Sequence, residues 1–189
     1  MTQNPALPNR RSVRLKGYDY SLPGAYFITL VSHRRAYLFG HIENCQMHPS
    51  PLGKIIAEEW TRTNTLRREV QLYSDEWVLM PNHLHGIVWL VPTETAPEVV
   101  ADKPKPSQSA RSLSSFVAGF KSVVTRRARY ELGLQTIWQR GYYDHIIRTS
   151  DAFNDLWEYI DANPERWHTD LFNAKSGPSG IKKGIPGQN

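Results

Sequence analysis

The chain has 189 residues, of which 40% are hydrophobic and 22% are charged, as in an ordinary globular protein with a single core. No apolar run reaches the roughly 18 residues that a membrane helix needs, and the N-terminal stretch lacks the apolar segment of about 7–15 residues found in a secretory signal. The single cysteine, Cys45, excludes an intrachain disulfide and a multi-cysteine zinc site. These features predict a cytoplasmic protein that does not interact with membranes.

The net charge is +5, and the basic residues are unevenly distributed. Every charged residue from Lys103 to Arg129 is basic, and a second cluster contains Arg10, Arg11, Arg14 and Lys16. Such stripes suit a polyanion such as nucleic acid, which would place the protein at the nucleoid. A solvated, solubilising surface is the alternative that charge alone leaves open.

The first half of the chain predicts three strands and one helix. Residues 25–32 are β-branched and aromatic and follow Pro23-Gly24, which indicates a first strand. Pro51 opens a helix with apolar residues at helical spacing. Residues 69–80 and 84–91 are then predicted as a second and a third strand, paired as a hairpin across the turn signal Pro81-Asn82.

The second half begins with a loop over residues 92–110, which is rich in proline and charge. A long basic helix is predicted over 112–132 and a fourth strand over 138–148. A last helix is predicted over 151–163, because Pro164 forces the residue before it out of the helical region.

This order, β-α-β-β-α-β followed by a helix, is the split βαβ plan of ferredoxin-like proteins. We therefore expect an α+β fold in which an antiparallel sheet carries helices on one face, with a further C-terminal helix. We expect one domain over residues 13–172, a flexible N-terminus over 1–12, and a disordered Gly/Pro/Lys-rich tail over 173–189.

Two histidines, His83 and His85, interrupt the apolar run of the third predicted strand. Residues i and i+2 of a strand point to the same face, so the pair shares its face with Ile87 and Trp89. Imidazole is a common metal ligand, and two converging rings can share one ion. The alternative is a pair of structural histidines, hydrogen-bonded near the end of a hairpin.

The last predicted helix carries a tyrosine at the rim of its apolar stripe. Thr149 or Ser150 can cap the helix, and the stripe follows i, i+3, i+4, i+7 spacing through Phe153, Leu156, Trp157 and Ile160. Tyr159 lies at the edge of this stripe, and Asn163 is four residues further along the same edge. Alone, this pattern is more typical of a rim tyrosine followed by a C-terminal asparagine cap.

Three blocks in this order, PNHLHG, WQRGYYDHIIR and YIDANPERW, resemble the single-tyrosine HUH transposase family, most of all its REP-associated tyrosine transposase branch. The resemblance covers roughly Arg11 to Trp167. It implies that Tyr159 on the C-terminal helix is the catalytic residue and that His83 and His85 bind a metal ion. It also implies a third metal ligand at Asn163, where the wider family often has glutamine and the REP-associated branch is similar in using asparagine.

The implied reaction is metal-dependent cleavage and rejoining of single-stranded DNA through a 5′-phosphotyrosine intermediate, with Mg²⁺ or Mn²⁺ as the ion and a hairpin-forming palindrome as the substrate. His145 is an auxiliary candidate or a structural residue. The predicted DNA contacts are Arg11, Arg14, Lys121, Arg126, Arg127 and Arg140.

Two other functions remain open at this stage: a regulator that binds hairpin DNA without cutting it, and a hydrolase that uses the histidines to activate water. The sequence leaves the target site open, and it does not decide between a monomer and a homodimer.

Overall fold

An antiparallel five-stranded sheet forms the centre of the structure, a computed structural model that describes residues 15, 17–92 and 111–173. The central strands are β1 (Gly24–Val31) and β6 (His83–Leu90), which pair along their whole length. β7 (Tyr143–Ile147) pairs with the other edge of β1, while β4 (Val70–Gln71) and β5 (Trp77–Met80) both pair with β6. The predicted ferredoxin-like arrangement is confirmed, because the first and third predicted strands are central.

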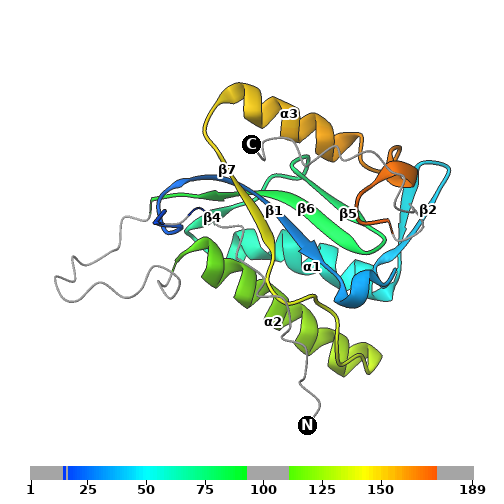
Figure 1. Cartoon of the computed structure of the whole chain (residues 1–189). Helices are drawn as coiled ribbons and strands as arrows, with labels where there is room; N and C mark the ends of the chain where they lie inside the picture. Colours follow the sequence, from blue (N-terminus) through cyan, green and yellow to red (C-terminus); the bar gives the residue numbers. More distant parts are fainter. Residues whose placement is uncertain (1–14, 16, 93–110, 174–189) are drawn as a thin grey trace, which may run out of the picture.

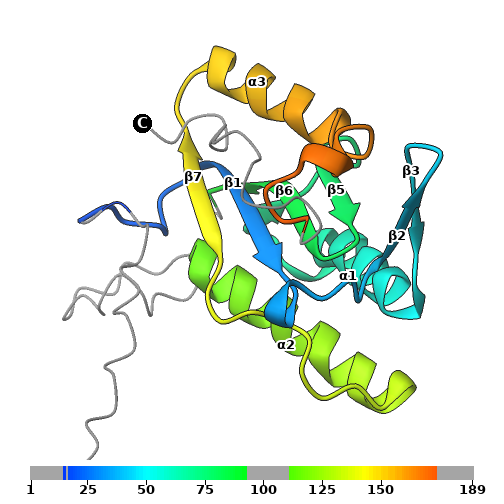
Figure 2. The same ribbon diagram turned by 45° about the vertical axis from the view of Figure 1, so that its right-hand side comes forward.

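Helices cover both faces of this sheet (Figures 1 and 2). The face covered by α1 (Pro51–Leu66) and α2 (Leu113–Leu132) buries alternate β1 residues, including Tyr26, Ile28 and Leu30. α3 (Ser150–Asp161) lies on the opposite face, where Leu156 and Ile160 pack against a smaller cluster. The α+β class, the pair of helices on one face and the additional C-terminal helix are therefore as predicted.

Local capping explains where the helices begin and end. The Ser50 hydroxyl accepts a hydrogen bond from the third helical residue of α1, and Ser112 forms a capping box at the start of α2. Gly133 ends α2 with a φ of 69°, a left-handed conformation that favours glycine. Thr149, one of the two caps considered for α3, accepts from the backbone N–H of Ala152.

The strand predicted over residues 69–80 is wrong in its continuity, because β4 and β5 are separate. The Asn64 side chain of α1 accepts from the backbone N–H of Leu72 at 2.7 Å and donates to its carbonyl at 2.6 Å. These bonds remove both polar groups of Leu72 from the ladder with β6, so the chain turns away before it returns as β5.

The fourth strand is shorter than its predicted span of 138–148. Trp138 makes only an isolated bridge to Ser32, and Gly141 has a φ of 76°, which breaks the extended conformation before β7. A hairpin of β2 (Gly40–Glu43) and β3 (Gln46–Pro49) was not predicted, because each strand has only four residues and one strongly apolar side chain, Ile42 or Met47. Short 3-10 helices complete the fold: η1 (His33–Arg35) and η3 (Trp167–Thr169).

Several predictions fall outside the residues that the structure describes. These are the N-terminal segment 1–12 with Arg11, then Arg14, nearly all of the loop 92–110, and the tail beyond Asn173. Asn173, where we expect the tail to begin, is itself buried and donates from its amide to the Trp167 carbonyl. Within the described ranges, no helix combines the length and apolar character needed to cross a membrane.

Candidate active site

Strand β6 holds His83 and His85 on the α3 side of the sheet, the face that Ile87 also occupies. Their neighbours Leu84 and Val88 point to the other face, toward α1 and α2. Both imidazoles are fully buried, and their ring centroids are 4.4 Å apart in an edge-to-face arrangement. The predicted convergence of the two rings is therefore present.

A chain of hydrogen bonds fixes the tautomer of His83. The Asn82 amide donates to the carbonyls of Arg35 at 3.0 Å and Phe172 at 2.7 Å, so its Oδ1 is an acceptor. Nδ1 of His83 lies 2.9 Å from that oxygen and must carry the hydrogen. Nε2 therefore carries a lone pair, which is buried and has no hydrogen-bond partner among the described residues.

His85 is oriented by the strand beside it. Thr29 is its cross-strand partner in β1, with the hydroxyl Oγ1 2.8 Å from Nδ1 of His85. The imidazole also stacks on Phe27, with ring centroids 5.2 Å apart. When Nδ1 donates to Thr29, Nε2 presents its lone pair to the Tyr159 hydroxyl, 3.4 Å away.

Burial keeps both imidazoles neutral. It lowers the pKa of His85 to about 3, and it lowers the pKa of His83 well below its usual 6.5, helped by nearby His85 and Arg35. Neutral imidazoles with free Nε2 lone pairs are in the form that binds a divalent cation.

Tyr159 reaches the histidines from α3. Its ring lies edge-on to His85, with centroids 5.2 Å apart, and also packs against Phe27. Burial, followed by the nearby charge of Asp170, raises the pKa of Tyr159 to about 12, while a hydrogen bond with Asn163 acts in the opposite direction. The side chain is therefore a neutral phenol at physiological pH.

Asn163 joins the same cluster, although not from the helix edge on which it was predicted. α3 ends at Asp161, and Asn163 lies in the turn that follows, with its backbone N–H bonded to the Ile160 carbonyl at 3.2 Å. Its side chain is 2% exposed, and Oδ1 has no hydrogen-bond partner within the described chain. The turn thus delivers the amide that was expected from an i+4 helical position.

Asp170 was missed by sequence reasoning, because it lies beyond the three blocks in an unpatterned segment. Its carboxylate is buried, and one ligand atom each from His83, His85 and Asp170 lie within 4.8 Å of one another. Burial raises the pKa of Asp170, while backbone N–H groups and Arg35 oppose the shift. Two imidazole nitrogens and a carboxylate oxygen form a donor set that fits a divalent cation.

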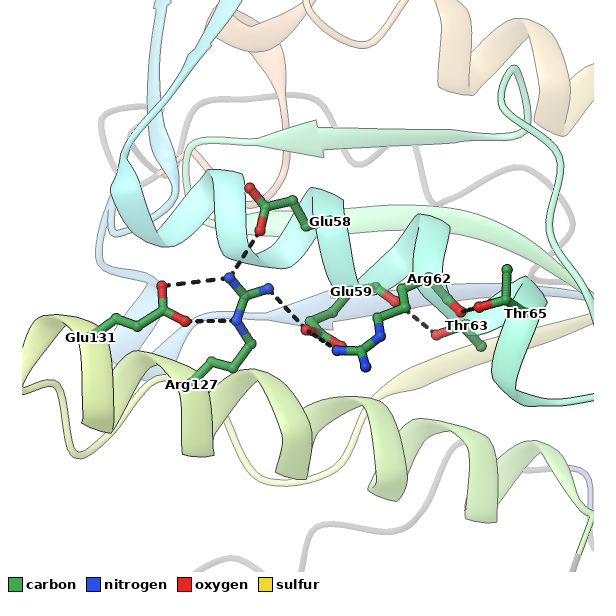
Figure 3. A network of polar contacts seen from close by, with 7 residues as sticks. All are labelled: Glu58, Glu59, Arg62, Thr63, Thr65, Arg127 and Glu131. Atoms are coloured by element: carbon green, nitrogen blue, oxygen red, sulfur yellow. Dashed lines mark hydrogen bonds and ion pairs between the residues drawn. The ribbon is translucent and has the colours of Figure 1, made fainter.

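The predicted DNA contacts on α2 differ in their surroundings. Arg127 bridges to α1, where Glu58 and Glu59 accept at 2.9 and 2.8 Å, and it also pairs with Glu131 (Figure 3). These carboxylates raise the pKa of Arg127, and the ion pairs hold the two helices together. Lys121 is also engaged, because its ammonium donates to the carbonyls of Gln139 and Gly141.

Arg126 and Arg140 are exposed and free to contact a polyanion. Arg126 lines a groove of about 420 Å³ on α2 together with Ala118, Lys121, Ser122, Thr125 and Arg129. Because α2 and α3 cover opposite faces of the sheet, this groove is separated from the histidine pair by the sheet itself.

Other residues singled out in the sequence lie closer to the sheet edge. His145 of β7 pairs across the strands with Phe27, so it faces the same side as His85 and is half-buried. Trp138 is half-buried and packs between Phe39 and Phe120. Tyr143 lies against Phe172, with ring centroids 5.7 Å apart.

Comparison with known proteins places this geometry in context. The chain is 36% identical over 172 residues to an uncharacterized protein from Haemophilus influenzae, covering 88% of this chain and 94% of that relative. It shares a fold with a REP-associated tyrosine transposase bound to a REP hairpin, with a TM-score of 0.52 and 18% identity over 82% of this chain and 74% of that one. No protein-family model matches the chain. The likeness in fold agrees with the family resemblance found in the sequence.

Proposed function

We propose that this chain, which belongs to the same family as the Haemophilus influenzae protein and has the fold of a REP-associated tyrosine transposase, cleaves and rejoins single-stranded DNA. The observation that carries the proposal is the position of the Tyr159 hydroxyl, 3.4 Å from Nε2 of His85. A half-buried phenol beside two buried, neutral imidazoles is the arrangement expected for a tyrosine nucleophile.

In the proposed reaction the Tyr159 oxygen attacks a backbone phosphorus. The new Oη–P bond replaces the bond from phosphorus to the 3′ oxygen, and the phenol proton ends, in net terms, on the released 3′-hydroxyl. A 3′-hydroxyl of the same or another strand then attacks the phosphotyrosine, and the phenol recovers its proton. A phenol suits both directions, because its pKa near 10 in water makes it a better leaving group than an alkyl hydroxyl.

The residues of the cluster have distinct roles in this scheme. His83, His85 and Asn163 would hold a divalent ion, Mg²⁺ or Mn²⁺, which supplies positive charge for a non-bridging phosphate oxygen. Thr29 and Asn82 orient the imidazoles from behind, and Phe27 fixes the angle between His85 and the Tyr159 ring.

The proposed DNA partner is a hairpin with a single-stranded extension. Arg126 and the α2 groove would contact phosphates of the hairpin, while the extension passes round the β7 edge of the sheet to reach Tyr159. Arg11, Arg14 and Arg140 remain predicted phosphate contacts, and His145 is an auxiliary candidate on that route.

A covalent-adduct assay tests the proposal. Wild-type protein is mixed with Mn²⁺ and a hairpin oligonucleotide from the flanks of its own gene, labelled at either end, and run on a denaturing gel. A 5′-phosphotyrosine predicts that the 3′-labelled fragment migrates with the protein, while the 5′-labelled fragment is released with a free 3′-hydroxyl. Tyr159→Phe and the double variant His83→Ala/His85→Ala should abolish the adduct, whereas the matched control Tyr143→Phe should retain it.

The remaining results separate the competing functions. Cleavage without an adduct, unaffected by Tyr159→Phe, would show that the cluster is hydrolytic. A shifted native complex with the same oligonucleotide, but no cleavage at any metal concentration, would identify a regulator that binds hairpin DNA. Pure binding does not explain why two neutral imidazoles and an unpaired amide oxygen are buried beside a half-buried phenol.

A further inference from the structure

The segment from Trp167 to Asn173 covers the two histidines. The Phe172 ring lies 4.8 Å from His83 and 6.0 Å from His85, centroid to centroid, and Trp167 also faces His83. This cover brings Asp170 into the cluster from a part of the chain that the sequence motifs do not include.

The two carboxylate oxygens of Asp170 have different surroundings. Oδ1 accepts a hydrogen bond from the backbone N–H of Phe172 at 2.6 Å, which fixes the orientation of the group. Oδ2 lies 4.0 Å from Nε2 of His83. That distance is too long for a hydrogen bond. It does fit two ligands of one ion, because atoms at about 2.1 Å from a shared ion lie about 3.0 to 4.2 Å apart for angles of 90° to 180°.

Two buried acceptor atoms, Nε2 of His83 and Oδ1 of Asn163, have no hydrogen-bond partner among the residues that the structure describes. A buried polar atom without a hydrogen-bond partner costs free energy. A cation bound between Nε2 of His83 and Oδ2 of Asp170 would remove that cost for the imidazole.

The cover is held in place by groups that do not belong to the cluster. The Arg35 guanidinium donates to the Leu171 carbonyl at 3.2 Å and lies over the Phe172 ring. The Asn82 amide donates to the Phe172 carbonyl, and the Tyr37 hydroxyl donates to the Asn173 side chain. The Asp170 carboxylate is therefore positioned before any ion arrives.

We propose that Asp170 is a ligand of the ion that His83 and His85 hold, so that the centre is a two-histidine, one-carboxylate site with the Asn163 oxygen beside it. This inference rests on the proposed function for the presence of the ion, but not for the DNA chemistry. A carboxylate in place of an all-neutral ligand set lowers the net charge of the loaded site by one. It also gives a donor set that suits Mn²⁺ and other first-row divalent ions better than Mg²⁺, which prefers oxygen ligands.

Metal titration of the full chain without DNA tests the proposal. Mn²⁺ binding is followed by electron paramagnetic resonance of the free ion, and Co²⁺ binding by its visible absorption. Asp170→Asn should weaken Mn²⁺ binding at least about tenfold and change the Co²⁺ spectrum, while His83→Ala/His85→Ala should bind neither ion. Asp155→Asn, which alters an exposed carboxylate of α3, is the matched control and should bind as the wild type does.

Folding is checked separately. Asn at position 170 retains an oxygen for the Phe172 N–H, so the metal-free melting temperature of Asp170→Asn should stay close to that of the wild type. If Asp170→Asn does not fold, the increase in wild-type melting temperature caused by Mn²⁺ is compared with that of Asp170→Ala, and a smaller increase in the variant supports the proposal.

Two results would overturn the proposal: wild-type affinity and spectrum in Asp170→Asn, or no metal binding by folded wild-type protein. A failure of the DNA reaction is distinguishable, because a protein that binds Mn²⁺ through Asp170 but forms no adduct contradicts only the proposed function.

Discussion

The hydroxyl of Thr29 and Nδ1 of His85 lie 2.8 Å apart, as direct partners in the ladder between β1 and β6. The bond connects a buried strand residue to the imidazole that faces Tyr159, and when Nδ1 is the donor it leaves Nε2 of His85 unprotonated, 3.4 Å from the Tyr159 hydroxyl. A hydrogen bond behind a metal-binding imidazole fixes its orientation and raises its basicity.

Thr29→Val should therefore weaken Mn²⁺ binding about tenfold, the lower end of the range for such partners. Valine has nearly the same shape and favours strands, so the fold should persist, although the buried Nδ1–H loses its acceptor. Calorimetric titration gives the affinity, and Thr29→Ser, which keeps the hydroxyl, is the control. If both variants bind Mn²⁺ equally well, Thr29 does not orient His85.

The close approach of Trp60 explains why a glycine, Gly86, follows the second histidine. A Cβ at this position would lie 2.6 Å from Cζ2 of Trp60 and 2.8 Å from Cη2, on the face of the sheet opposite the histidines. Trp60 is 1% exposed and cannot easily move. Gly86→Ala should therefore lower the free energy of unfolding by about 1–3 kcal/mol, the usual range for overpacking.

Denaturant unfolding checks the effect at Gly86. Gly119→Ala is the matched control, because its Cβ would meet only the end of the Arg67 side chain, at 3.3 Å, and alanine is favoured in a helix by about 1 kcal/mol. Equal destabilisation of the two variants would show that close packing against Trp60 is not the cause.

The sequence was sufficient for the sheet plan, which follows from the order of strands and helices, and for the shared face of His83, His85 and Ile87, which follows from strand periodicity. It was not sufficient for the break between β4 and β5, which depends on Asn64 of α1 binding the backbone of Leu72. That contact is tertiary and has no local signal.

The candidate site, like the fold, was only partly predictable from the sequence. The Tyr159–Asn163 spacing predicted two neighbouring groups, although a turn rather than a helix edge brings them together. Asp170 belongs to no periodic element, and only the packing of Phe172 on the histidines brings its carboxylate close. Charge density on α2 likewise predicted DNA contacts but could not show that Arg127 faces three glutamates.

Arg127 and Arg126 are adjacent on α2, yet we expect opposite effects from their substitution. Arg127→Met should lower the free energy of unfolding by about 2 kcal/mol, because it leaves the Glu59 carboxylate, 4% exposed, with only Arg62 at 3.7 Å. This figure is below the usual range for a buried pair, since the Arg127 side chain is 27% exposed.

Arg126→Met should change the free energy of unfolding by less than about 0.5 kcal/mol, because its side chain is exposed. It should instead weaken hairpin binding and reduce the slope of log affinity against log salt by about 1. Denaturant unfolding and DNA titrations at several salt concentrations separate the two roles. A loss of DNA affinity in Arg127→Met without a loss of stability would show that Arg127 leaves its glutamates to contact DNA.

Lys121 makes stability depend on pH in a predictable direction. Burial lowers the pKa of its ammonium from 10.5 to about 8, although the group donates to the carbonyls of Gln139 and Gly141. Between pH 8 and 10.5 the unfolded chain binds a proton that the folded chain has released, so this residue makes the folded state more stable as the pH rises. The neutral amine still has hydrogens for both carbonyls.

The free energy of unfolding of wild type minus that of Lys121→Met should therefore increase between pH 8 and 9.5. We expect an increase of about 1 kcal/mol over this interval. A difference of one whole bound proton between the two states would give roughly 1.4 kcal/mol per pH unit. The expected value is smaller because the side chain keeps some access to water. Urea unfolding at several pH values provides the difference, and Lys54→Met, which removes an exposed lysine of α1, provides the baseline. A difference that stays flat or shrinks as the pH rises would show that the two carbonyls stabilise the charged ammonium enough to cancel the cost of its burial.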